Sequence, residues 1–150
     1  SSNWLKPAAA AKNPDTVTVW YPNSTNKLTF WDRSKTKTSW KVIWDTRTWA
    51  AGSKYNAFVG GDNPYSEIVN PTLNDGSACV VIKDSFGNCF VPYLTQNYRN
   101  VYVVDYRSFR QLDLNGLVDY FKIDDVIFLN NLTLCQADVT ASNLEALIGG

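Results

Sequence analysis

The stretch over residues 79–94 constrains the fold more than any other part of this chain. An unbroken apolar run, residues 79–82, stops abruptly at Lys83-Asp84-Ser85. Apolar residues then recur with the spacing of a helix. A short apolar run bounded by polar residues is typical of a strand buried on both faces, as in parallel sheets. The pattern therefore predicts a buried strand, a sharp turn at Ser85 and a helix.

Two more apolar runs, over residues 101–105 and 125–129, predict two further buried strands. An amphipathic helix is predicted between them over 112–121, and a short closing helix near 144–148. Alternation of strands and helices within so short a stretch indicates right-handed crossovers and a parallel sheet. We therefore expect a three-layer, flavodoxin-like α/β core, with Ser85, Asp105 and Asn130 on one rim.

That rim is where open α/β folds bind ligands, outside the carboxyl ends of the strands. Two roles are open to Ser85. It can act with Asp84 as an ordinary helix cap. Alternatively, its hydroxyl projects into the crevice beside helix N-terminal amides, which are suited to meet negative charge.

A family resemblance bears on this choice. The block Lys83-Asp84-Ser85-Phe86-Gly87-Asn88 resembles the nucleophile block of the SGNH (GDSL-like) hydrolases, with Lys83 in place of the usual glycine. Together with 58–64, 101–107 and 125–131, it resembles the C-terminal part of the bacterial DHHW proteins. These are distant SGNH relatives, akin to the alginate-acetylating enzymes of cell envelopes. The resemblance covers residues 55–132, and the first fifty residues fit only loosely.

The resemblance implies that Ser85 is a nucleophile, that an upstream Asp–His pair activates it, and that Asn130 or Asn131 helps to bind the oxyanion. It also implies a bacterial extracellular or cell-envelope location. The family is named for an upstream Asp-His-His-Trp motif, yet this chain has no histidine. We therefore expect the C-terminal portion of an esterase or O-acetyltransferase for envelope carbohydrate, inactive alone. Its expected partners are a carbohydrate or acyl-ester substrate and a missing upstream segment of the same protein.

Other polar residues of the rim receive supporting roles. A serine hydroxyl needs a base within hydrogen-bond reach, and carboxylates such as Asp84 and Asp105 are weak bases towards it. Lys83 shares a strand face with Ser85, but we expect its ammonium to stay charged at the solvent end of the strand.

The double glycine of 58–64 (Phe-Val-Gly-Gly-Asp-Asn-Pro) permits positive φ and close backbone approach to a ligand. The Gly61 amide or the Asn63 side chain is therefore a candidate oxyanion donor, and the Asn88 amide lies on the same rim. The alternative is an ordinary exit from a strand into a loop.

The N-terminal third is different in character. Residues 1–14 form a loose lead-in, and 15–57 an aromatic-rich β appendage to the α/β part at 58–150. Strands that can pair as a hairpin are predicted at 16–21 and 27–31, with a turn at 32–35 and a loop at 48–57. Residues 39–44 fit a strand or a short helix. Five of the six tryptophans lie between Trp20 and Trp49. They form either a sugar-binding platform or a core and interface. A non-catalytic carbohydrate-binding or scaffold module is thus the alternative function.

Composition sets the remaining limits. A chain of 150 residues makes one domain, and its 14 basic and 14 acidic residues cancel, so nothing favours a nucleic-acid partner. No apolar run approaches the ~18 residues that span a bilayer. Cys79 and Cys89 are expected to be free, buried thiols, whereas the sequence leaves the state of Cys135 ambiguous. We expect no metal and no cofactor, since histidine and a glycine-rich phosphate loop are both missing. Because methionine is also missing, we expect a processed chain or a piece of a longer one.

Overall fold

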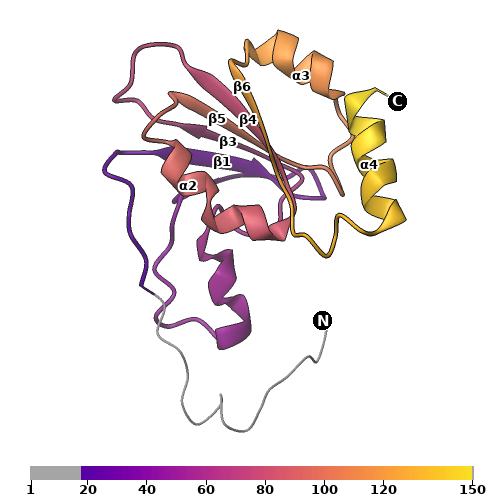
Figure 1. Cartoon of the computed structure of the whole chain (residues 1–150). Coiled ribbons are helices and arrows are strands. Elements are labelled where there is room, and N and C mark those ends of the chain that lie inside the picture. The colour runs from indigo at the N-terminus through magenta and orange to yellow at the C-terminus, as the bar shows by residue number, and fades with distance from the viewer. Residues whose placement is uncertain (1–17, 150) are drawn as a thin grey trace, which may run out of the picture.

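The computed structural model describes residues 18–149, which form one six-stranded sheet with helices on both faces (Figure 1). The strand order is β2-β1-β3-β5-β4-β6. The strands are β1 (Lys27–Trp31), β2 (Lys37–Trp40), β3 (Tyr65–Val69), β4 (Ala78–Lys83), β5 (Asn100–Asp105) and β6 (Asp125–Leu129). The helices are η1 (Ala51–Ala57) and η2 (Ser85–Cys89), both 3₁₀, and α2 (Val91–Leu94), α3 (Leu114–Phe121) and α4 (Asp138–Ile148).

The three strands predicted from apolar runs exist and are parallel. β4 lies between β5 and β6, with Lys83 opposite both Asp105 and Leu129. All six residues of β4 are buried, as its unbroken apolar sequence indicates. The carboxyl ends of these strands therefore meet at one rim, as expected.

The rest of the sheet corrects the prediction of a flavodoxin-like parallel sheet. β3 pairs antiparallel with β5 and with β1, and β1 pairs antiparallel with β2. The sheet is mixed, and the aromatic-rich segment supplies two of its six strands, β1 and β2, rather than forming an appendage. The sequence pattern missed β3, which alternates between buried and half-buried residues and joins the two halves.

The N-terminal strands also differ from expectation. Residues 16–17 lie outside the described part, and 18–21 form no strand. β1 instead forms its hairpin with β2 through the predicted turn at 32–35, where the Asp32 carboxylate accepts the Ser34 and Thr36 N–H groups. The ambiguous stretch 39–44 continues β2 only to Trp40, and much of the expected loop at 48–57 is the helix η1.

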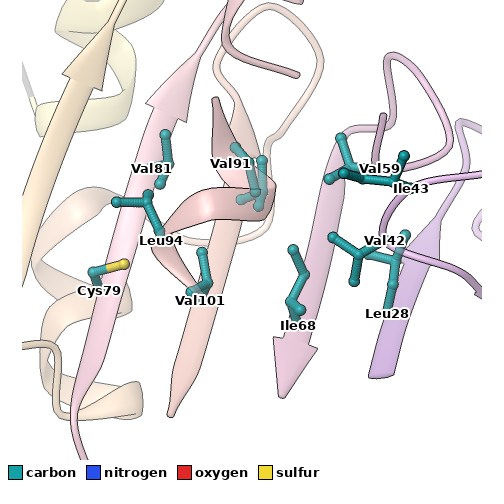
Figure 2. Close-up of a cluster of buried hydrophobic side chains, with 11 residues drawn as sticks. Leu28, Val42, Ile43, Val59, Ile68, Cys79, Val81, Val91, Leu94 and Val101 are labelled. Carbon is teal, nitrogen blue, oxygen red and sulfur yellow. The ribbon is translucent and has the colours of Figure 1, made fainter. Parts of the chain in front are cut away.

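The sheet separates the hydrophobic core into two layers, and helices cover each layer. α2 packs on one face through Val91 and Leu94, which join the cluster drawn in Figure 2. α3 and α4 lie on the opposite face, where Leu117 and Leu147 pack against Val80 and other apolar residues of the sheet. The predicted helix after Ser85 is shorter than expected: one 3₁₀ segment followed by a single α-helical turn.

The exposure of β6, the state of the thiols and the length of the helices also bear on the expectations. β6 was expected to be buried, but Val126 is 40% and Phe128 49% exposed. All three thiols are free, with Cys79 buried, Cys89 only half-buried and Cys135 exposed. Within residues 18–149, none of the helices is long and apolar enough to cross a membrane.

Candidate active site

Ser85 begins η2 immediately after the buried strand β4 and its cap residue Asp84. The backbone is extended at Asp84, with φ −95° and ψ −170°, and turns directly into the 3₁₀ helix. Ser85 is half-buried, whereas Lys83 and Asp84 are fully buried. The predicted strand-to-helix turn is therefore confirmed, and its serine keeps contact with solvent.

Asp84 performs the capping role and more. The Phe86 N–H donates to its Oδ1 over 2.8 Å, and the Asn131 N–H donates to its Oδ2 over 2.6 Å. One carboxylate thus binds the start of η2 and the segment that follows β6. Because each oxygen accepts a backbone N–H in a fully buried place, Asp84 is engaged in holding the turn.

A network of charged side chains lies beside this turn. Arg107 donates from Nη2 to Asp62 over 3.0 Å and from Nε to Asp105 over 2.8 Å. Asn88, on η2, donates from Nδ2 to Asp62 over 2.8 Å. Lys83 Nζ lies 3.7 Å from Asp62 and 3.9 Å from Asp105. Two cations and two carboxylates therefore tie together β4, β5, η2 and the double-glycine loop.

The burial of Lys83 corrects the expectation that it sits at the solvent end of the strand. Its side chain is 1% exposed, and Nζ has no hydrogen-bond partner. Burial lowers the pKa of Lys83, while the nearby charges of Asp105 and Asp62 oppose that shift. The loop carrying Asp62 folds over the strand end, a long-range contact that strand periodicity does not reveal.

The pKa values of Asp62 and Arg107, the two most exposed members of the network, are shifted in opposite directions. Burial acts to raise the pKa of Asp62, but the Asn88 hydrogen bond and the charges of Lys83 and Arg107 outweigh it, so this pKa is lowered. The pKa of Arg107 is raised, chiefly by its hydrogen bond to Asp105. Both groups are therefore charged at neutral pH.

The double-glycine loop has the predicted backbone conformation, with φ +74° at Gly60 and +87° at Gly61. Its polar groups bond within the loop: the Gly61 N–H donates to Phe58 O over 3.0 Å. Asn63 is buried, and its Nδ2 donates to Gly60 O over 3.3 Å. The structure thus brings Asp62 of this loop to the network but not the side chain of Asn63.

The two asparagines after β6 lie on the Ser85 rim but differ in their contacts. Asn131 binds Asp84 through its backbone, and its Oδ1 accepts the N–H and hydroxyl of Thr133. Asn130 has a buried Oδ1 without a hydrogen-bond partner. The predicted common rim of Ser85, Asp105 and Asn130 is confirmed by the parallel pairing of β4, β5 and β6.

The sequence profile described as "DHHW protein" matches residues 5–104. The chain belongs to the DHHW protein family. The match extends the resemblance noted at 55–132 into the first fifty residues, which had fitted only loosely. A search of curated protein sequences gave no match.

Solved structures show the same fold as this DHHW-family chain. A DHHW family protein from Eubacterium siraeum is 22% identical with TM-score 0.79, over 95% of this chain and 47% of its own. Bacillus cereus PatB1 is 24% identical with TM-score 0.64, over 79% of this chain and 39% of its own. A PatB1 structure with a sulfonyl adduct is 23% identical with the same TM-score and the same coverage. The chain thus spans about half the length, or less, of these proteins.

The sequence pattern did not indicate two residues of this site. Tyr55, on η1, donates its hydroxyl to Ser85 O over 2.8 Å and so packs over the serine turn. Arg107 binds both carboxylates of the network. Its one sequence signal is its place two residues after the strand-ending Asp105; Tyr55 gave no signal, because its helix was predicted to be a loop.

The arrangement offers Ser85 a half-buried turn but no histidine and no unengaged carboxylate of the network as a base. Asp84, Asp62 and Asp105 are engaged as described, and the chain contains no histidine. A cavity of about 340 Å³, lined by Trp31, Tyr65 and other apolar residues, lies on the α3 side and does not include Ser85. No group of three His, Cys, Asp or Glu side chains within 18–149 is arranged to hold a metal.

Proposed function

We propose that this chain carries the nucleophile, Ser85, of an SGNH-like serine esterase or O-acetyltransferase that acts on cell-envelope carbohydrate. The observation that carries the proposal is the place of Ser85: a half-buried serine at the tip of the turn between the central buried strand and η2. Such a turn aims a hydroxyl into the space outside the sheet, where α/β folds bind ligands.

The surroundings of Ser85 fit a fixed nucleophile. The Asp84 carboxylate holds the turn by accepting the Phe86 and Asn131 N–H groups, and the Tyr55 hydroxyl donates to the Ser85 carbonyl oxygen. Neither contact uses the Ser85 side chain. A nucleophile held in place by its neighbours requires little reorganisation on reaching the transition state.

The proposed reaction is acyl transfer. The Ser85 Oγ attacks the carbonyl carbon of an acetyl ester, its proton passes to a base, and the alcohol leaves with a proton. Water or a carbohydrate hydroxyl then attacks the acyl-serine and releases Ser85. Both half-reactions need a base, and we place it outside these 150 residues, in a histidine of the kind that names the family.

One structural relative with the same fold supports a proposal of nucleophilic chemistry. PatB1 has been observed with a sulfonyl adduct. Sulfonyl reagents modify activated nucleophiles, above all serine hydroxyls with a base beside them. An SGNH-like acyl transferase would act on polysaccharide outside the membrane, and we therefore also propose a cell-envelope or extracellular location for this protein.

The test compares two proteins, each with and without Ser85→Ala: the 150-residue chain and the product of the complete reading frame that encodes it. The substrate is 4-nitrophenyl acetate, followed at roughly pH 6 to 9. We expect a Ser85-dependent rate only in the complete product, where the alanine variant should lose at least about 10³-fold. Trapped acetyl-serine should appear by mass spectrometry on the peptide containing Ser85.

Two results would refute this assignment. Full activity of the complete product carrying Ser85→Ala would remove Ser85 as the nucleophile. A clear Ser85-dependent rate in the chain alone would remove the need for an outside base. A rate that rises with an apparent pKa near 7 to 8 would then identify Lys83, since a neutral amine is the base.

A non-catalytic carbohydrate-binding module is the second candidate. It is favoured by the adjacent Trp20 and Tyr21, which are 76% and 61% exposed. Flat aromatic faces that remain in solvent are suited to stack on sugar rings. Binding of envelope polysaccharide that is lost in Trp20→Ala but kept in Ser85→Ala, without any Ser85-dependent rate, would favour this function over catalysis.

A further inference from the structure

The strand β6 has the sequence of a buried strand but is partly exposed to solvent. Its core, Val126-Ile127-Phe128-Leu129, is as apolar as the central strand β4 and has no polar alternation. Runs of this kind belong to strands buried on both faces. In the structure, however, Val126 and Phe128 are 40% and 49% exposed, and Leu132 just beyond the strand is 78% exposed.

β6 is also the last strand of the sheet, paired with β4 alone. Edge strands are normally protected by lysine, proline, a bulge or short polar sequence, because free backbone groups invite another strand. β2, at the opposite edge, has that protection in its sequence Lys37-Thr38-Ser39-Trp40. The four apolar residues of β6 have none of these devices.

We propose that the β6 edge surface, meaning the open backbone of β6 with Val126, Phe128 and Leu132, binds an apolar strand from a part of this protein that lies outside the 150 residues. The length of the relatives selects this occupant. This chain covers 47% of the Eubacterium siraeum protein and 39% of PatB1 while matching their fold. The relatives therefore hold about as much chain again, enough to continue the sheet past β6.

The added strand is parallel to β6. Both pairings of β4 are parallel, and uninterrupted apolar sequence is the mark of a strand inside a parallel sheet. A parallel neighbour brings its carboxyl end to the rim beside Asn130, on the side of Ser85 away from Asp105. If the proposed function holds, the missing base approaches Ser85 from this side. The binding of the added strand to β6 does not depend on catalysis.

The experiment is hydrogen–deuterium exchange at β6, on the 150-residue chain and on the product of the complete reading frame. We expect the β6 amides that do not bond to β4 to exchange rapidly in the chain alone. In the complete product they should slow by about 100-fold, as in an interior strand. Light scattering on the chain alone should show a monomer.

Phe128→Asp and Tyr120→Asp are the matched variants. Tyr120 is 75% exposed, lies on α3 and is not one of the residues of the β6 edge surface. In the 150-residue chain both changes should lower the melting temperature only modestly, because each side chain is already about half or more exposed. In the complete product, only Phe128→Asp should lower the melting temperature and restore fast exchange at β6.

Three outcomes would overturn the proposal: equally fast exchange at β6 in both proteins, equal effects of the two variants in the complete product, or a dimer of the chain alone with protected β6 amides. The last would make a second copy the occupant. Running the exchange on Ser85→Ala keeps the questions separate. A protected β6 without any Ser85-dependent rate would end the proposed function and leave the interface standing.

Discussion

At the scale of single residues, Lys83 carries the largest electrostatic consequence. Its ammonium is buried between Asp62 and Asp105, and Asp105 is itself only 1% exposed. Removing one partner of a buried ionic group leaves the remaining charge uncompensated, which costs far more than losing a surface ion pair.

We expect Lys83→Met to lower the free energy of unfolding by less than the ~3 kcal/mol of a fully broken buried ion pair, because Arg107 still pairs with both carboxylates and burial already disfavours the Lys83 ammonium. Methionine keeps the apolar stem, and among residues 18–149 it leaves Arg107 as the cation paired with Asp105. Urea unfolding at pH 7 measures the change, with Lys54→Met on the exposed helix η1 as the control. Equal stability of the Lys83 variant and the wild type would mean that the ammonium contributes nothing to the network.

Asp62 gives the network a pH dependence with a definite sign. Its pKa is below the ordinary carboxyl value, so the folded state prefers the ionised form. The stability that it contributes is present above the unfolded pKa of about 3.9 and is lost as pH falls through the folded pKa.

The difference in unfolding free energy between wild type and Asp62→Asn should therefore be constant from about pH 7 to 5 and shrink below about pH 4. Urea titrations across this range measure it. Exposed Asp119→Asn serves as the control and should show a much smaller difference. A difference that grows on acidification would reverse the sign of the argument.

At the scale of elements, η2 fits closely against β4 and β6. A Cβ on Gly87 would lie 2.7 Å from the Cβ of Lys83 and 3.0 Å from Leu129 Cδ2. The first of these atoms sits at the base of a buried side chain and cannot swing away. Glycine at 87 is therefore what lets the serine turn lie flat on the strand ends.

We expect Gly87→Ala to destabilise the fold by about 1–3 kcal/mol through overpacking. Gly52→Ala is the matched control, because a Cβ at Gly52 meets nothing within 4 Å. Thermal unfolding compares the two, and nuclear magnetic resonance shifts report whether the Ser85 turn moves. Similar melting temperatures for both variants would show that η2 is free to lift from the sheet.

Local sequence pattern was a good guide wherever an element's own residues decide its form. The apolar runs of β4, β5 and β6, the amphipathic α3 and the turn before Ser85 were all predicted. The pattern of β3 was not distinctive, because a short alternating strand depends on partners far away in sequence. The same reason hid the burial of Lys83 and the contact of Tyr55, since both come from segments that meet only in the folded chain.

At the scale of the whole molecule, residues 18–57 supply part of the hydrophobic core. Leu28, Val42 and Ile43 join the same core cluster as Cys79 and Val81 of the central strand (Figure 2). β1 supplies the antiparallel neighbour of β3, and β3 in turn that of β5. The two halves of the chain therefore share one core.

We expect a truncated chain of residues 58–150 to lack cooperative unfolding, although it contains Ser85, Asp105 and Asn130. The deletion removes one side of a core cluster and exposes β3 as a bare edge. Circular dichroism on heating tests this against the 150-residue chain. A sharp transition of the truncated chain would show that the parallel half folds independently.

The carboxylate of Asp84 gives the molecule a mechanical link. It accepts N–H groups from Phe86 at the start of η2 and from Asn131 just after β6, so we expect the serine turn and the end of β6 to shift together. A contact that displaces the outer strand β6 would therefore displace the backbone at Ser85 as well, through the one carboxylate that binds both segments.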